Sequence, residues 1–350
     1  MSNSTQIPSA PARQIGIIYD GYFVPREVLH VSQICVVHIL QLSLSVFGMC
    51  TNIVNILVFA KMSFSNSVII SYLVLSLSDF AFVAGSLLQI IILTLVRVGV
   101  KSYVPIHHLI CLVQWGPRMF YDVSGLVTVF IALQKCYCVA RPLRFKTVFT
   151  DVRTFVILLV ICSTTAISYV PLYASQGLRW KHVGPYRNQS KLDIWFSEDW
   201  QTVFRINDMG NRNVLPTISQ IIVLLCLLVL VHRLRAASRF RQQTSTMEKQ
   251  QDNPEAMSSR DVQAVKAVSL VAAIFVICNF PLVVTTYATL VEPEFNNYRK
   301  YHNLYVLIYD LRYTFLLLSA SGNMLVYYKY NTNYRERLYQ VLPCKRGTKE

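Results

Sequence analysis

Charged side chains are scarce in this sequence. Asp, Glu, Lys and Arg make up 15% of the residues, whereas ordinary soluble domains carry roughly a quarter. Hydrophobic residues make up 53%, and a soluble fold would have difficulty hiding that much apolar surface. The composition therefore argues against a soluble protein.

Arrangements typical of enzymes and metal sites are also missing. The sequence has no metal-ligand spacing, no Gly-rich phosphate loop and no Ser/His/Asp cluster in a water-accessible order. Most of the nine cysteines fall within apolar segments, where they pack as small apolar side chains. We therefore expect no catalysis, no metal centre and no cofactor.

What the sequence does contain is long apolar segments. A helix needs about 20 mostly apolar residues to cross a bilayer, because lipid offers no partner for backbone N–H and C=O groups. Seven segments meet this requirement: 34–60, 67–96, 108–140, 153–175, 214–236, 263–290 and 302–328. Amphipathic periodicity is largely missing, which argues against a large helical soluble protein. We predict an all-α membrane protein, a seven-transmembrane helix bundle.

The basic residues indicate the orientation of this bundle. The net charge is +15, but Lys and Arg gather between the fifth and sixth segments, after the third and after the last, which predicts topology rather than nucleic-acid binding. The loop between the fourth and fifth segments is also basic, so the glycosylation sequons at Asn3 and Asn188 add needed support. We expect residues 1–33 outside the cell, without a cleavable signal peptide, and the tail 329–350 in the cytoplasm. This is the topology of a multi-pass plasma-membrane protein.

One carboxylate lies at membrane depth. An ionisable group there costs about 2.5 kcal/mol or more, so Asp79 must face the bundle interior and find partners. Ser124 of the third segment and Ser319 and Asn323 of the last can supply them. Two interpretations stay open: a polar pocket for a small cation such as sodium, or a structural hydrogen-bond network without an ion.

Four motifs occur in register with these segments. They are Gly48-Met-Cys-Thr-Asn52, Leu75-Ser-Leu-Ser-Asp79, Phe275-Val-Ile-Cys-Asn-Phe-Pro281 and Asn323-Met-Leu-Val-Tyr327. In them the chain resembles a rhodopsin-like (class A) G-protein-coupled receptor over residues 34–344. The wording from Thr51 and from Asn323 onward is similar to invertebrate, particularly molluscan, chemosensory and FMRFamide-like peptide receptors.

The resemblance implies a function. Such a receptor binds an extracellular ligand, here a peptide or a small chemosensory molecule, and signals to a heterotrimeric G protein by rearranging its helices. A degenerate or atypically coupled receptor is the first alternative. A seven-helix transporter is less favoured, because neither internal repeats nor broken midplane helices are evident.

The third segment departs from the family where Asp-Arg-Tyr is usual. Gln134 stands in the place of the acid and Lys135 in that of the arginine. Lysine keeps the charge but loses the planar fork of donors, and no acidic neighbour restrains it. Two hypotheses follow: raised basal activity, or weakened coupling to the G protein.

Two further departures concern switch positions. Asn279 replaces the family's tryptophan, two residues before Pro281. Met324 replaces the proline after Asn323, so the last helix should be less kinked there. Tyr327 has no tyrosine partner in the fifth segment.

The family's disulfide is missing as well. The resemblance places its first cysteine at Cys111, but residues 176–213 contain no second one. Cys111 is therefore expected to be a free thiol unless Cys35 reaches it. The loop must be mobile or be held by packing, for which the aromatic candidates are Trp180, Trp195, Phe196 and Trp200.

Ligand candidates lie in the outer halves of the segments. Pro117 stands where amine receptors place an acid, so a simple amine is not expected. The candidates are Arg118, Tyr121, Asp122, Tyr287, Asp310, Arg312 and Tyr313. Arginines among aromatic residues suit an anionic or peptide ligand. Alternatively, Arg118 pairs with Asp122, four residues further along the same helix face.

The inner side offers basic residues to a G protein. Besides Lys135, they are Arg141, Arg144, the stretch 233–241 and Lys266, although positive-inside topology alone explains such charges. Residues Asn331 to Leu342 read as an amphipathic helix on membrane lipid, with Tyr334 and Leu338 facing inward. Cys344 follows as a palmitoylation candidate.

Overall fold

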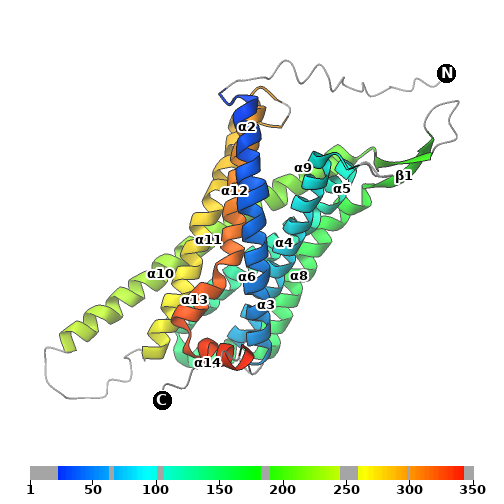
Figure 1. Ribbon diagram of the computed structural model, residues 1–350. Coiled ribbons are helices and arrows are strands. Elements are labelled where there is room, and N and C mark those ends of the chain that lie inside the picture. Colours follow the sequence, from blue (N-terminus) through cyan, green and yellow to red (C-terminus); the bar gives the residue numbers. More distant parts are fainter. Residues whose placement is uncertain are drawn as a thin grey trace, which may run out of the picture.

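Seven helices in the computed structural model are long and apolar enough to cross a membrane. The structure describes residues 23–62, 67–100, 106–182, 190–244, 259–297 and 299–342. The helices pack side by side into one bundle (Figure 1), which confirms the predicted all-α architecture. We number them spans 1 to 7 in chain order.

Several spans are assembled from more than one helical piece. Span 1 joins α2 (Arg26–Gln33), the π-helical η1 (Ile34–Gln41) and α3 (Leu42–Ala60); span 2 is α4 (Ser67–Val98); span 3 joins α5 (Ile106–Val113) and α6 (Trp115–Ala140). The short α7 (Pro142–Val148) leads to span 4, which is α8 (Asp151–Ala174). Span 5 joins α9 (Trp200–Asn207), the π-helical η2 (Asp208–Val214) and α10 (Leu215–Thr244); span 6 is α11 (Ser259–Val291); span 7 joins α12 (His302–Ser321) and α13 (Asn323–Tyr330).

The bundle buries polar groups and exposes apolar ones. Large apolar side chains are exposed along the spans, among them Leu225, Leu228, Ile277, Phe280 and Leu325. Small polar side chains are buried between the spans, among them Ser45, Asn52, Asn55, Ser71 and Ser86. A water-soluble protein rarely exposes so extensive an apolar surface. The outer surface of this bundle is suited to lipid.

The helices extend beyond the predicted apolar segments. Span 1 begins at Arg26 rather than residue 34, and span 5 begins at Trp200 rather than residue 214. Hydropathy marks only the apolar part of a helix, and the polar stretch Asp208–Val214 is helical although it resembles a loop in composition. The prediction that the whole of 176–213 is a loop is therefore wrong.

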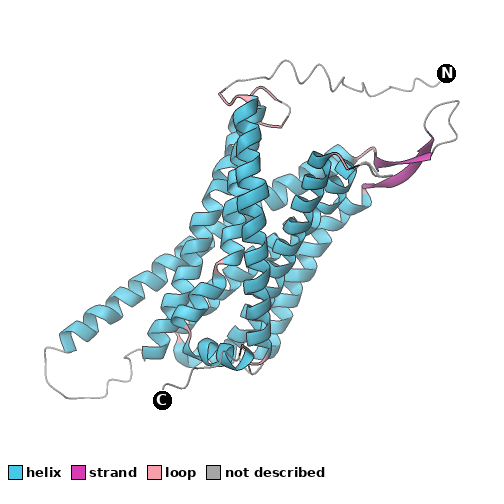
Figure 2. Ribbon diagram, viewed as in Figure 1, coloured by secondary structure: helices cyan, strands magenta, loops and turns pink. Residues whose placement is uncertain are grey.

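The rest of that connection is a β-hairpin. Strand β1 (Gln176–His182) pairs antiparallel with β2 (Ser190–Phe196), and Gly177 lies opposite Trp195. The hairpin projects from one end of the bundle, which we call the hairpin end (Figure 2). The final helix α14 (Thr332–Val341) crosses the opposite end, the α14 end (Figure 1).

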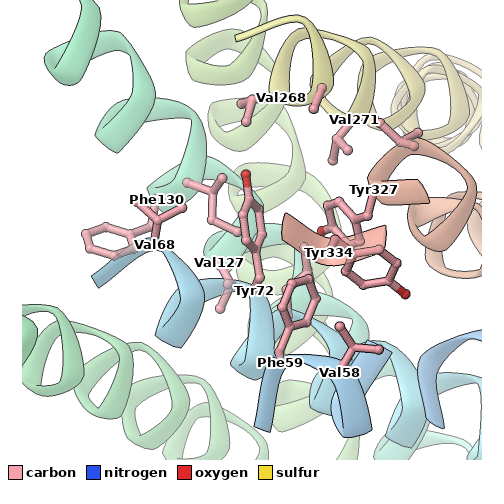
Figure 3. Packing of buried hydrophobic residues seen from close by; sticks show 14 of the residues in the cluster. Val58, Phe59, Val68, Tyr72, Val127, Phe130, Val268, Val271, Tyr327 and Tyr334 are labelled. Carbon is pink, nitrogen blue, oxygen red and sulfur yellow. The ribbon is translucent and has the colours of Figure 1, made fainter. Parts of the chain in front are cut away.

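An aromatic cluster fixes α14 against the bundle. Figure 3 shows Tyr334 beside Tyr327 and Phe59, with Tyr72 completing the group. The ring of Phe59 lies 5.3 Å from that of Tyr327 and 5.4 Å from that of Tyr334, centroid to centroid. Tyr334 and Leu338 are buried and Arg337 is exposed, as the amphipathic pattern predicts. Aromatic pairs at such distances add stability beyond simple burial.

Span 7 is divided at Gly322 into α12 and α13. The amide of Leu325 donates to the carbonyl of Gly322, three residues back, at 3.2 Å. The carbonyls of Ala320 and Ser321 accept instead from side chains of span 1, Asn52 Nδ2 at 3.0 Å and Thr51 Oγ1 at 3.2 Å. These bonds compensate for an interruption that requires no proline.

Candidate functional site

A cavity of about 670 Å³ opens among spans 2 to 7 toward the hairpin end. Aromatic and apolar side chains form most of its wall, and charged groups converge within it. The charged members are Arg118, Asp122, Asp208, Arg212 and Arg312. Concave sites with an apolar wall and a few placed polar groups are typical of small-molecule binding. We call it the main cavity.

Two of its arginines converge on one tyrosine. Arg118 Nη2 donates to the hydroxyl of Tyr309 at 2.9 Å. The guanidinium of Arg312 lies over the Tyr309 ring, 4.4 Å from its centroid. Arg312 is only 5% exposed, and its Nη1 has no hydrogen-bond partner among the described residues. The cavity thus contains a buried cation with an unused donor.

The acids of the main cavity are engaged elsewhere. Asp122 accepts a hydrogen bond of 2.6 Å from the hydroxyl of Tyr169 in span 4. Asp208 forms an ion pair of 3.2 Å with Arg212, whose Nη2 also donates to Tyr305 at 3.1 Å. In the described chain no ion pair joins Arg118 to Asp122, so the predicted pair within one helix face is wrong. Each of them instead contacts a tyrosine of another span.

A second cavity, of about 640 Å³, lies among spans 1, 2, 3 and 7. It shares Arg118, Tyr309 and Tyr313 with the main cavity. Asp310 lines it, and Oδ2 of this residue has no hydrogen-bond partner among the described residues. The three shared residues form the wall between the two cavities.

Five of the seven ligand candidates predicted from the sequence meet in the main cavity, and Asp310 lines the second one. Arg118, Tyr121, Asp122, Arg312 and Tyr313 all line it. Tyr287 does not: it is 43% exposed, and its hydroxyl lies 3.2 Å from Thr217 Oγ1. Residue type alone did not reveal that Tyr287 faces away from the cavity.

The sequence prediction missed other lining residues. Arg212 was placed in a loop because the polar start of span 5 was not recognised as helix. Tyr309, which lines both cavities, and Tyr305, which accepts a hydrogen bond from Arg212, were also missed. Together with Tyr313 they recur every four residues along α12, the spacing of one helix face. That spacing was the available signal.

The main cavity is connected to span 6 through its inner wall. The hydroxyl of Tyr121 donates to Asn279 Oδ1 at 2.8 Å, and Asn279 Nδ2 donates to the carbonyl of Phe275 at 2.9 Å. Pro281 lies within α11, two residues further, where it cannot donate a backbone hydrogen bond. A tyrosine that lines the main cavity is thus hydrogen-bonded to α11 two residues before its internal proline.

Asp79 lies between spans 3 and 7. Its Oδ1 accepts from Ser124 Oγ, and its Oδ2 accepts from Asn323 Nδ2 at 2.8 Å. Asp79 is 1% exposed. Ser319, four residues before Asn323, is also buried. In the described structure it does not hydrogen-bond to Asp79. Three of the four predicted pocket residues are therefore in direct contact.

Gln134 joins three spans near the α14 end. Its Oε1 accepts from Ser71 Oγ of span 2 at 3.1 Å, and its Nε2 lies 3.5 Å from Thr154 Oγ1 of span 4. The side chain is fully buried. Lys135 is half-buried, whereas Arg141 is exposed at the end of α6. The glutamine makes neutral hydrogen bonds at the position where the resemblance implies an acid.

Tyr327 is buried without a hydrogen bond. Its exposed fraction is 1%, and its hydroxyl has no partner in the described part of the chain. This agrees with the expectation that span 5 supplies no tyrosine for it. Its ring packs on Phe59 and on Tyr72 instead.

Non-covalent contacts hold the hairpin. Cys111 and Cys35 are both free thiols. Gln176, at the start of β1, places its Nε2 3.4 Å from the carbonyl of Cys111. Among the expected aromatic anchors, Phe196 packs on Trp200 with the ring centroids 4.8 Å apart, whereas Trp180 is 69% exposed.

Three predicted modification sites lie outside the described residues. They are the sequons at Asn3 and Asn188 and the palmitoylation candidate Cys344. They stay predictions.

Comparison with known proteins gives one match. The family model described as "Serpentine type 7TM GPCR chemoreceptor Srw" matches residues 39–345. That range includes spans 2 to 7, most of span 1 and every residue that lines the main cavity. No curated protein matches.

Proposed function

The chain belongs to the serpentine-type seven-transmembrane GPCR chemoreceptor family Srw, and from that premise we propose that it binds an extracellular chemical ligand in the main cavity and signals to a heterotrimeric G protein. The ligand is either a small chemosensory molecule or a peptide. The rhodopsin-like motifs and the wording similar to FMRFamide-like receptors support this proposal.

The observation that carries the proposal is the bond between Tyr121 and Asn279. Tyr121 lines the cavity, and Asn279 belongs to α11 beside its internal Pro281. A ligand that displaces the Tyr121 ring breaks or redirects this 2.8 Å hydrogen bond. Because ligands act by binding one arrangement better than another, this contact gives the ligand influence over span 6.

The proposal includes an orientation. The hairpin end faces outward, and the α14 end faces the cytoplasm, where the basic residues gather. The G-protein surface would then include Lys135 and Arg141 near the end of α6. The hydrogen bonds of Gln134 support an inactive arrangement that needs no acid–arginine pair, and both raised basal activity and weakened coupling remain hypotheses.

A receptor that binds its ligand without coupling is the second candidate. The observation that favours it is the pair Gln134 and Lys135, which lacks the acid and the arginine fork of the family. Such a chain would respond to ligand in a binding assay and stay silent in a signalling assay.

Expression in reporter cells with a promiscuous G protein tests the proposal. Neuropeptides and water-borne odorants are screened side by side, and hits are repeated with Tyr121→Phe, which removes only the hydroxyl. We expect at least one ligand-dependent response, weakened in Tyr121→Phe. The matched control is Tyr339→Phe, whose ring is exposed on α14. A response unchanged in Tyr121→Phe would contradict the proposed route through Asn279.

A further inference from the structure

We propose that the ligand carries a carboxylate, which binds between Arg118 and Arg312 in the main cavity. This inference rests on the proposed function, since it names the chemical class of that ligand. It goes beyond the family, whose description names no ligand.

Arg118 and Arg312 carry positive charge without a paired acid in the described part of the chain. Arg118 and Arg312 form no ion pair with any described carboxylate: Arg118 donates to the hydroxyl of Tyr309, and Arg312 lies over the ring of the same residue. A buried cation without a counter-charge is strongly disfavoured. A ligand carboxylate would supply the missing charge.

The two acids of the cavity leave part of its positive charge without a counter-charge. Asp122 already accepts from Tyr169, and Asp208 is paired with Arg212. Asp122 keeps its negative charge in the hydrogen bond from the neutral Tyr169, but among the described residues it is then the single acid of the cavity left for two arginines, Arg118 and Arg312. The positive charge of the cavity is consequently directed toward whatever enters it.

Two buried guanidinium groups of the cavity have unused hydrogen-bond donors. Nη1 of Arg312 and Nε of Arg212 are both buried without a partner among the described residues. Each of these N–H groups can donate a charge-assisted hydrogen bond to a carboxylate oxygen. The site thus offers both charge and direction.

The wall of the main cavity also restricts the chemistry of the ligand. Away from the arginines, aromatic and aliphatic side chains line the cavity: Phe82, Trp115, Phe204, Leu282 and Leu316. Such a wall favours an apolar body attached to the carboxylate. It suits a small aromatic or aliphatic acid, or a peptide with a free C-terminus, better than an amidated peptide.

Binding to the purified full-length receptor in detergent tests the inference without a G protein. The probes are 3-phenylpropionate and its neutral isostere 3-phenylpropionamide, each titrated while the apparent Tm is followed with a thiol-reactive dye. We expect the carboxylate to raise the Tm and to bind about tenfold more tightly than the amide, or better. Octanoate and inorganic phosphate complete the panel.

Variants locate the effect. Arg312→Gln and Arg118→Gln should each abolish the preference for the carboxylate. Arg205→Gln should keep it, because Arg205 is exposed on α9 and lines neither cavity. Should either site variant fail to fold, the matched probes on the wild-type chain still decide the question.

The negative outcomes are distinct. Equal binding of acid and amide, or no Tm change with any carboxylate, would overturn the inference, as would stabilisation by phosphate alone. An arginine-dependent preference without any signalling would leave the carboxylate site standing and contradict the coupling to a G protein. Signalling by neutral ligands that is unaffected by both arginine variants would do the reverse.

Discussion

The hydroxyl of Tyr334 donates to Oδ1 of Asn55 at 2.6 Å, joining α14 to span 1 across 279 residues of sequence. Both residues are fully buried. Burial also raises the pKa of Tyr334, so its hydroxyl remains protonated and donates at neutral pH. This bond is the polar centre of an otherwise aromatic contact.

Removal of that hydroxyl should destabilise the receptor. Tyr334→Phe leaves the Asn55 side chain without its partner, and a buried polar group without one costs about 1–3 kcal/mol. We expect a lower apparent Tm in detergent. Tyr339→Phe is the matched control, because the Tyr339 ring is 53% exposed and its hydroxyl meets only that of exposed Tyr328. Equal losses in the two variants would show that the bond to Asn55 contributes nothing.

Asp79 should tolerate asparagine better than alanine. Asn keeps one acceptor oxygen for Asn323, and its NH2 group can donate to the hydroxyl of Ser124, whereas Asp79→Ala leaves both donors unsatisfied. We expect surface expression and Tm to fall in the order wild type, Asp79→Asn, Asp79→Ala.

The same variants distinguish a cation pocket from a structural network. If sodium binds Asp79, replacing choline chloride by sodium chloride at constant ionic strength should raise the Tm of the wild type and not that of Asp79→Asn. A salt response identical in both proteins would favour the network without an ion.

Gln134→Ala should raise ligand-free signalling. The change removes the bonds to Ser71 and Thr154 that hold spans 2, 3 and 4 together near the α14 end. Second-messenger output without ligand measures the effect at matched surface expression. Gln340→Ala, at an exposed position of α14, should have no effect. Unchanged or lower output in Gln134→Ala would contradict a restraining role for this residue.

The hairpin end should be insensitive to reduction. Cys111 is a free thiol, and the contact of Gln176 with its carbonyl involves no sulfur. Dithiothreitol and Cys111→Ser should therefore leave the Tm unchanged. A drop with either treatment, reproduced by Cys35→Ser, would reveal a bridge between Cys111 and Cys35.

Gly85→Ala should loosen the contact of spans 2 and 3. A Cβ atom at this position would lie 2.5 Å from Cγ of Pro117, whose ring cannot rotate away. Such overpacking costs about 1–3 kcal/mol, so the Tm should fall. Gly210→Ala in span 5 meets no atom within 4 Å and serves as the control. A Gly85→Ala variant as stable as the control would mean that the two spans separate easily.

The sequence predicted those features whose alternatives cost much free energy in a membrane. The fold followed from seven apolar segments, since backbone groups in lipid require helices. The contacts of Asp79 with Ser124 and Asn323 followed because an isolated carboxylate is not tolerated there. In both cases the penalty leaves few alternatives.

Helix faces and helix starts were not predictable in the same way. Tyr287 has the residue type of a ligand contact but lies outside both cavities, because composition does not fix the rotation of a helix. Arg212 was missed because a polar helical extension has no hydropathy signal. For Asp122 the sequence offered Arg118 as one possible partner, yet its hydrogen bond comes from Tyr169, 47 positions later. Partners distant in sequence require the packed bundle.

Because span 7 is interrupted at Gly322, the stiffness of span 7 depends on its contacts with span 1. The carbonyls of Ala320 and Ser321 are held by Asn52 and Thr51. Swinging α13 against α12 therefore exchanges two side-chain bonds and leaves the regular backbone ladders of both pieces intact. A substitution in span 1, remote from both the ligand and the G protein, would then change the free energy that is needed to move α13 relative to α12.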